Sequence, residues 1–141
     1  MTDAISDQNR AALPLRVLIA DGSPTSSDGW TEMLAENDDI EVVGCARKAI
    51  QALTLVEKLQ PDAVLLDIEM PGETFAFVLN LIKRDPHPPS VLVLIPYPSG
   101  VLRERCLDAG ADFVFTKTTD LERIIKALEK LAQAKQSIDS N

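Results

Sequence analysis

The sequence predicts an α/β fold in which a doubly wound, five-stranded parallel sheet is covered by helices on both faces. Apolar runs of strand length recur along the chain and alternate with segments whose apolar residues repeat at helical spacing. Such alternation is typical of parallel sheets joined by right-handed crossovers. A chain of 141 residues is long enough to bury the core of one domain.

Each predicted strand is a short apolar run bounded by turn-forming residues. The strands are residues 15–20, 40–45, 61–67, 90–95 and 112–116. A helix follows each strand, and the first helix is predicted to begin after a Ser23 cap with Pro24 in its first turn. The predicted domain covers residues 15–135, between a flexible tail of residues 1–14 and a polar tail of residues 136–141.

Composition narrows the class of protein. Hydrophobic residues make up 45% of the chain and charged residues 26%, which is typical of a globular protein. A net charge of -8 would repel a phosphate backbone, so we expect protein partners and no direct nucleic-acid binding. No apolar stretch approaches the roughly 20 residues of a membrane span, and residues 1–14 lack the basic start and apolar centre of a signal peptide. We therefore expect no membrane insertion and a cytoplasmic location.

Asp67 is the leading candidate for a functional residue. It ends an apolar run that lies between Pro61 and the pair Pro71-Gly72, as a central strand buried on both faces would. Open α/β sheets place ligand-binding and catalytic groups at the carboxyl ends of their strands. An alternative is that Asp67 only caps the turn before the next helix.

Three further residues end predicted strands. If the strand order is 2-1-3-4-5, Asp21, Ile95 and Lys117 converge with Asp67 at one edge of the sheet. Two adjacent carboxylates repel each other unless a cation joins them, and their hard oxygens suit magnesium. A carboxylate can also attack a phosphoryl group, whose oxygens a lysine would then neutralise. The residue types alone equally allow a plain ion pair between Asp67 and Lys117.

Longer motifs carry a family resemblance. They are Val17 to Asp21 followed by Ser23-Pro24, Pro61 to Gly72, and Ala109 to Asp112 leading to Lys117. From Arg16 to about Leu131 the chain resembles the receiver domain of two-component response regulators, of the kind found in chemotaxis regulators. The resemblance implies a flavodoxin-like fold.

The resemblance also implies a site. Asp67 would accept a phosphoryl group from a sensor histidine kinase or a phosphotransfer protein, and Lys117 would contact the phosphate. Magnesium would be held by Asp21, Asp67 and the backbone carbonyl of Glu69.

The chain departs from the family pattern at several pocket positions. Gly22 stands where the family usually has a second acid, so we expect a weakened magnesium site. Ile95 replaces the Thr or Ser that bonds the phosphoryl group, and Ile95 has no side-chain donor. Val114 replaces the aromatic switch residue, and Thr118 replaces the proline after the lysine. Asp67 and Lys117 remain, while the acidic pocket, which Asp21 and Asp67 form, is degenerate because it lacks the second acid usual in the family.

Two functions therefore remain open. One is a stand-alone response-regulator receiver that is phosphorylated on Asp67 and signals by changing its affinity for a downstream protein. The other is a pseudo-receiver that binds partners in one state regardless of phosphorylation. Neither is an enzyme beyond self-catalysed phosphorylation and dephosphorylation.

The partner surface is predicted near the last strand. It includes Leu102, Phe115 and Ile125, on the side that receivers commonly use for output or dimerisation, so a homodimer is among the partners considered. The polar residues expected to flank this surface are Arg103, Arg105 and Arg123. The alternative is that these arginines form only a solvated basic patch.

Overall fold

A five-stranded parallel sheet forms the centre of the computed structural model, which describes residues 13–72 and 74–140. The strand order is β2-β1-β3-β4-β5, which confirms the predicted fold class. The strands are β1 (Leu15–Ala20), β2 (Ile40–Ala46), β3 (Ala63–Asp67), β4 (Ser90–Ile95) and β5 (Phe113–Thr116). The helices are α2 (Pro24–Leu34), α3 (Ala49–Leu59), α4 (Phe75–Ile82), α5 (Gly100–Asp108) and α6 (Leu121–Ser140).

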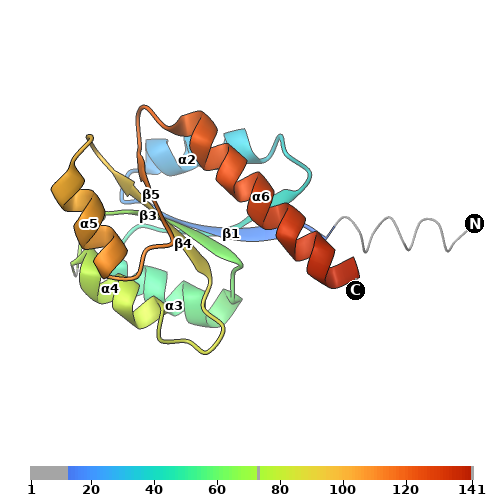
Figure 1. Cartoon of the computed structure of the whole chain (residues 1–141), viewed down its shortest axis with the longest axis horizontal. Coiled ribbons are helices and arrows are strands. Elements are labelled where there is room, and N and C mark those ends of the chain that lie inside the picture. The colour runs from blue at the N-terminus through green and yellow to red at the C-terminus, as the bar shows by residue number, and fades with distance from the viewer. Residues whose placement is uncertain (1–12, 73, 141) are drawn as a thin grey trace, which may run out of the picture.

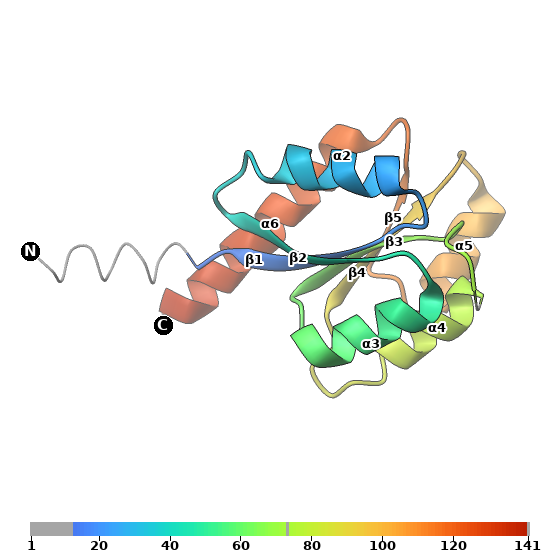
Figure 2. The same cartoon turned by 180° about the vertical axis from the view of Figure 1, so that it is seen from behind.

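Helices cover both faces of the sheet. Figures 1 and 2 show α2 and α6 on one face and α3, α4 and α5 on the other. All five residues of β3 are buried, because a central parallel strand packs side chains on both of its faces. Two apolar clusters result, one on each side of the sheet. Because all neighbouring strands pair in parallel, their carboxyl ends lie at the same edge of the sheet, where the predicted site residues lie.

Helix α2 starts as predicted. Ser23 is its N-cap, and the Ser23 side chain accepts a 3.2 Å hydrogen bond from the Ser26 N–H. Pro24 occupies the first turn, where its missing N–H leaves no helical bond unmade. Trp30 and Leu34 then face the core. This cap aims the start of the helix at the end of β1, next to Asp21.

The C-terminal end of the chain differs from the predicted tail. Residues 136–140 continue helix α6 and are not a polar tail, since α6 runs to Ser140. In this added length the Gln136 Nε2 donates to Asp39 Oδ1 at 3.0 Å, and just before it Lys135 Nζ donates to the Pro14 carbonyl at 2.9 Å and to Asp62 Oδ2 at 2.8 Å. Residues 1–12 of the predicted N-terminal tail lie outside the described residues. In the described part of the chain, no helix is long and apolar enough to cross a membrane.

Backbone hydrogen bonds fix the carboxyl edge of the sheet. The N–H of Asp21 donates to the Ala46 carbonyl at 2.9 Å, and the N–H of Lys117 donates to the Ile95 carbonyl at 2.8 Å. Parallel pairing continues to the last residues of the strands, with Ile95 opposite Thr116. The site residues are therefore placed by the rigid sheet and not by a free loop.

Candidate functional site

Lys117 joins the two predicted carboxylates. Its Nζ donates to Asp67 Oδ2 at 2.6 Å and to Asp21 Oδ2 at 2.9 Å. The side chain of Asp21 is 3% exposed, that of Asp67 is 5% exposed, and that of Lys117 is 23% exposed. At these distances two buried negative charges share one ammonium group, which reduces the repulsion between them. The predicted convergence of these residues at one edge of the sheet is thus observed.

Asp21 is the more heavily hydrogen-bonded carboxylate. Besides the Lys117 bond, Oδ1 accepts from the Ser23 N–H at 2.9 Å, and Oδ2 accepts from the Ser26 hydroxyl at 2.6 Å. Burial alone would raise the pKa of Asp21, but the Ser26, Ser23 and Lys117 contacts outweigh burial and lower the pKa. Burial likewise opposes the charged form of Lys117, and its bonds to Asp67 and Asp21 outweigh burial and raise the pKa of Lys117. The charged forms of both groups are therefore stabilised.

The two carboxylate oxygens of Asp67 accept hydrogen bonds from different groups. Oδ2 faces Lys117, whereas Oδ1 accepts from the Glu69 N–H at 2.8 Å. The Asp67 backbone carbonyl accepts from the Met70 N–H at 3.1 Å. Asp67 thus caps the turn, which was the alternative interpretation of this residue, and it also takes part in the charged cluster with Asp21 and Lys117. Capping alone does not account for this residue.

The oxygen donors assigned to magnesium suit that ion in type. Mg²⁺ is usually bound by one or two carboxylates while it keeps several waters, and Asp21, Asp67 and the Glu69 carbonyl offer such oxygens. The donor set is small, however, because the described residues contain no group of three or more His, Cys, Asp or Glu side chains that could hold a metal ion. Lys117 Nζ also contacts both carboxylates. These oxygens fit Mg²⁺ in type, and the weakness of the site stays a prediction.

The two predicted switch positions are filled by aliphatic side chains. Ile95 and Val114 are each 3% exposed and belong to the same apolar cluster, on the side of α3, α4 and α5. The flanking rings of Phe113 and Phe115 point to the opposite face, where they stack 6.0 Å apart. Alternation along β5 therefore keeps both aromatic rings away from the position that the family uses for its switch.

Sequence reasoning missed Ser26. This residue lies five positions after Asp21 in the first turn of α2, and its hydroxyl bonds the Asp21 carboxylate. The signal was present, since a Ser-Pro cap after the strand makes the helix turn back over the end of β1. A second missed contact is the Arg103 guanidinium, which donates to the Val114 carbonyl at 2.9 Å.

The residues predicted to form the partner surface lie on and around the edge strand β5. Leu102 packs against the cluster on the side of α3, α4 and α5, whereas Phe115 and Ile125 pack on the opposite face of the sheet. The three arginines also separate. Arg103 bonds β5, Arg105 lines a pocket between α4 and α5, and Arg123 lines a groove between β5 and α6. Because β5 is the edge strand between α5 and α6, these contacts do not test the predicted partner surface, which stays a prediction.

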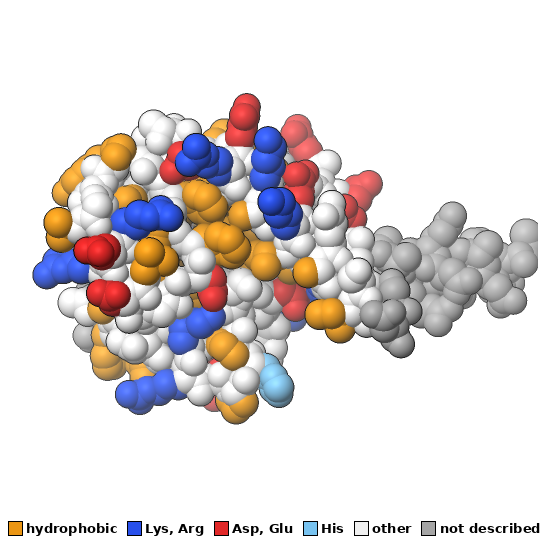
Figure 3. Space-filling model, viewed as in Figure 1, with side chains coloured by type: hydrophobic (Ala, Val, Ile, Leu, Met, Phe, Trp, Pro, Cys, Tyr) orange, Lys and Arg blue, Asp and Glu red, His pale blue; other side chains and the backbone are white. Residues whose placement is uncertain are grey.

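The β5–α6 groove is basic at its rim and aromatic at its floor. Its lining residues are Phe113, Phe115, Arg123, Lys126, Ala127, Lys130 and Leu131. Figure 3 shows hydrophobic side chains gathered over β5 and α6 with Lys and Arg side chains around them. This combination is notable on a chain with a net charge of -8.

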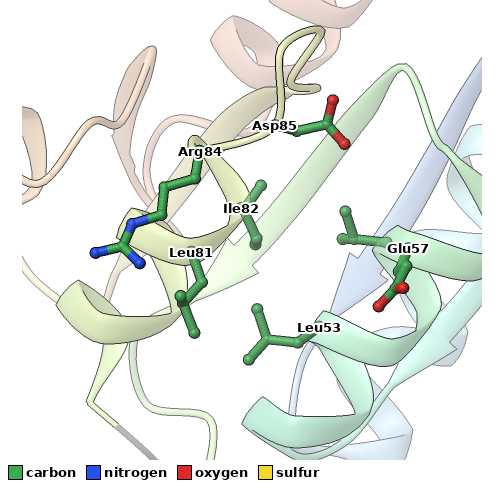
Figure 4. A pocket seen from close by; sticks show the side chains of 7 residues that line it. Leu53, Glu57, Leu81, Ile82, Arg84 and Asp85 are labelled. Carbon is green, nitrogen blue, oxygen red and sulfur yellow. The ribbon is translucent and has the colours of Figure 1, made fainter.

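A second groove lies between α3 and α4, and none of the acidic-pocket residues line it. In Figure 4, Leu53 of α3 and Leu81 of α4 face each other across the groove, with Glu57 and Asp85 at its rim. Its mixed charges and apolar floor match no ligand of a single charge.

Comparison with known proteins identifies the family. The model of the response regulator receiver domain matches residues 17–129. The chain belongs to this receiver domain family. Over the described residues the sheet order is 2-1-3-4-5, with five helices around the five strands, which matches the receiver fold. Receivers of this family are parts of two-component signalling systems and are generally not enzymes themselves.

Individual relatives agree with this assignment. The receiver is 30% identical over 123 residues to the sensory transduction protein LytT of Bacillus anthracis, covering 87% of this chain and 49% of the relative. It is 28% identical to the receiver domain of a NarL response regulator from Mycobacterium tuberculosis, with a TM-score of 0.79 and coverage of 86% and 98%. The CheX-CheY-BeF3-Mg complex from Borrelia burgdorferi shares the fold, at 21% identity, a TM-score of 0.75 and coverage of 84% and 90%. The chain spans about half the length of the curated relatives it matches.

Proposed function

We propose that this receiver accepts a phosphoryl group on Asp67 and signals through contact with a protein partner. One observation carries the proposal. The Asp67 carboxylate lies at the carboxyl end of β3 with Lys117 Nζ at 2.6 Å, so the acceptor and a charge for phosphoryl oxygens are already together. The donor would be a histidine kinase or a phosphotransfer protein, as the family implies.

The chemistry needs one new bond and one broken bond. An Asp67 carboxylate oxygen attacks phosphorus, the P–N bond of a phosphohistidine donor breaks, and the imidazole leaves with the electron pair. Lys117, which contacts Asp67 in the resting pocket, would bond a phosphoryl oxygen instead. Mg²⁺ held by Asp21, Asp67 and the Glu69 carbonyl would supply positive charge to the phosphoryl oxygens when bound.

A phosphorylation-independent pseudo-receiver is the second candidate, and a specific observation favours it. The two switch positions, Ile95 and Val114, are both aliphatic and buried in one apolar cluster. Without a hydroxyl at Ile95, the family's link from the phosphoryl group to the helices lacks its side-chain donor. On this hypothesis Lys117 balances the acidic pocket permanently.

The β5–α6 groove is the best-supported partner surface. Its Phe113 and Phe115 rings offer an apolar floor, and Arg123, Lys126 and Lys130 add positive charge at the rim. An acidic segment with one or two apolar side chains would match both features. A second copy of this chain, with its net charge of -8, is an alternative occupant.

Intact-protein mass spectrometry tests the proposed acceptor. After incubation with acetyl phosphate and Mg²⁺, we expect the mass of one added phosphoryl group, and we expect no addition in Asp67→Asn. Asp28→Asn is the matched control, because it removes an exposed carboxylate from α2 and should leave phosphorylation unchanged. An unmodified wild-type protein under these conditions would favour the pseudo-receiver.

A further inference from the structure

Helix α4 carries apolar side chains on its outer face as well as on the face buried against the sheet. On the outer side Phe77 is 49% exposed, and Leu81 is half-buried. A surface helix usually turns polar residues toward solvent, but Asn80 is the one polar residue of α4. Large apolar side chains that are exposed together commonly mark an interaction site.

The neighbouring face of α3 is apolar in the same way. Ile50 is 66% exposed, and Leu53 is half-buried. Leu53 follows Ile50 by three positions and Glu57 follows it by seven, so these side chains lie along one stripe of the helix. The stripe starts with apolar residues and ends with a carboxylate. In Figure 4, Leu53 of this stripe faces α4 across the groove.

The matching stripe of α4 ends in a charge of the opposite sign. It runs from Phe77 through Leu81 to Arg84, seven positions after Phe77. Figure 4 shows Arg84 and Glu57 on opposite sides of the groove. Both side chains are exposed, and neither forms an ion pair with another described residue. Because α3 and α4 each connect parallel strands on the same face of the sheet, they run in the same direction, and their charged ends lie at the same end of the groove.

We propose that the α3–α4 face binds a second copy of this chain, about a twofold axis that runs parallel to the two helices. This axis sets α3 of one copy against α4 of the other. Ile50 then faces Phe77 of the second copy and Glu57 faces its Arg84, and symmetry repeats both contacts. The proposal does not depend on phosphorylation of Asp67, and none of these residues lines the β5–α6 groove.

The charges at the stripe ends favour a second copy over a partner of another kind. In a twofold interface each patch meets itself, so a rim of one charge sign would repel its copy. Here each copy brings one carboxylate, on Glu57, and one guanidinium, on Arg84, so every charge meets its opposite across the axis. An acidic or a basic partner would match only one of these two groups.

Sedimentation velocity of the full chain, at several concentrations and without a phosphoryl donor, tests the proposal. We expect a monomer–dimer equilibrium with a dissociation constant on the order of 10–100 μM, because the patch is small for a stable interface. Ile50→Glu and Phe77→Glu should each weaken the dimer at least about tenfold. A wild-type chain that stays monomeric up to about 1 mM would overturn the proposal and leave the groove to a different partner.

Val101→Glu is the matched control. Val101 is 68% exposed and is the second residue of α5, as Ile50 is the second residue of α3. It should leave the dimer unchanged. A dimer that is lost in Val101→Glu and kept in Ile50→Glu would place the interface elsewhere and overturn the proposal. Because no phosphoryl donor is present, failure here is distinct from failure of Asp67 phosphorylation.

A charge exchange tests the orientation of the two copies. Glu57→Arg and Arg84→Glu each set like charges against each other across the axis, so each should weaken the dimer about fivefold or more. Glu57→Arg changes the net charge from -8 to -6, and Arg84→Glu changes it to -10. Repulsion between whole chains would therefore move the two variants in opposite directions. Weakening in Arg84→Glu alone would overturn the proposal.

Combining the two changes should restore the dimer. The double variant Glu57→Arg, Arg84→Glu keeps the net charge of -8 and pairs opposite charges again, so its dissociation constant should return to within about twofold of wild type. A mixture of the two single variants should likewise form a mixed dimer, since both contacts across the axis are then complementary. A double variant that dimerises no better than the single variants would contradict the proposed arrangement.

Discussion

The ammonium group of Lys117 donates a 2.6 Å hydrogen bond to Oδ2 of Asp67, although the two residues are 50 positions apart in the chain. The bond links the ends of β3 and β5 across the intervening strand β4. Since the same nitrogen reaches Asp21, one cation balances both carboxylates of the pocket. Several consequences can be measured.

Replacing Lys117 should destabilise the fold. Lys117→Gln leaves the nearly buried Asp21 and Asp67 carboxylates facing each other without a cation. Because breaking a buried ion pair from one side is costly, we expect a loss of about 2–4 kcal/mol in the free energy of unfolding, measured with urea. Lys83→Gln is the matched control, since its partner Asp112 is 38% exposed and the loss should be about 1 kcal/mol or less. Equal losses in the two variants would show that the pocket charges are not coupled as the distances indicate.

The hydroxyl of Ser26 should set the acid limit of stability. The folded-state pKa of Asp21 lies below the usual 3.8, so its stabilisation is present above that pH and is lost as pH falls through the folded-state pKa. Ser26→Ala removes one bond to the carboxylate, which should move acid unfolding to higher pH and cost about 1–2 kcal/mol near neutrality. Circular dichroism against pH measures both effects.

Thr54→Ala provides the control for this experiment. The Thr54 hydroxyl donates to the Ile50 carbonyl on the exposed side of α3, so its removal should leave the pH of acid unfolding unchanged. If Ser26→Ala and Thr54→Ala unfold at the same pH, the Ser26 bond does not stabilise the charged form of Asp21. At the alkaline end the raised pKa of Lys117 acts in the opposite sense, and its stabilisation is lost as pH rises through that pKa.

A hydroxyl at residue 95 should restore the conformational response to phosphorylation. Ile95→Thr introduces a donor at the end of β4, beside the β5 residue that precedes Lys117. We expect larger NMR shift changes in β5 and α5 on phosphorylation than in wild type, with a stability cost of about 1–3 kcal/mol for altering a buried site. Ile95→Val trims the side chain without adding a hydroxyl. If Val and Thr respond alike, the missing donor is not what limits the response.

Charge reversal in the β5–α6 groove should weaken partner binding. The triple variant Arg123→Glu, Lys126→Glu, Lys130→Glu changes the rim and leaves the Phe113–Phe115 floor intact. A partner that the wild-type chain binds should be bound at least about tenfold more weakly, and wild-type binding should weaken with added salt. Lys48→Glu and Lys58→Glu together add negative charge elsewhere. Loss of binding in this control as well as in the triple variant would indicate an effect of net charge and not of the groove.

The sequence by itself determined the order of the fold and the identity of the charged residues. Apolar runs of strand length ending at Asp21, Asp67 and Ile95 predict a parallel sheet, because a strand buried on both faces must be apolar nearly throughout. Since the carboxyl ends of parallel strands share one edge, Asp21, Asp67 and Lys117 could be brought together before any distance was known. The length of α6 was underestimated, because residues 136–140 are mostly polar and the sequence does not reveal a contact such as that between Gln136 and Asp39.

Only the tertiary structure decided how the pocket is closed. That Lys117 reaches both carboxylates, that Ser26 turns back onto Asp21, and that Leu102 and Phe115 lie on opposite faces all depend on distances between separate segments. Gly22 shows the difference most clearly. The sequence shows a missing acid there, and only the structure shows that a Cβ at Gly22 would lie 2.5 Å from Cδ of Pro71, 49 positions further along the chain. Local patterns record which groups are present, whereas steric exclusion arises between surfaces that meet only after folding.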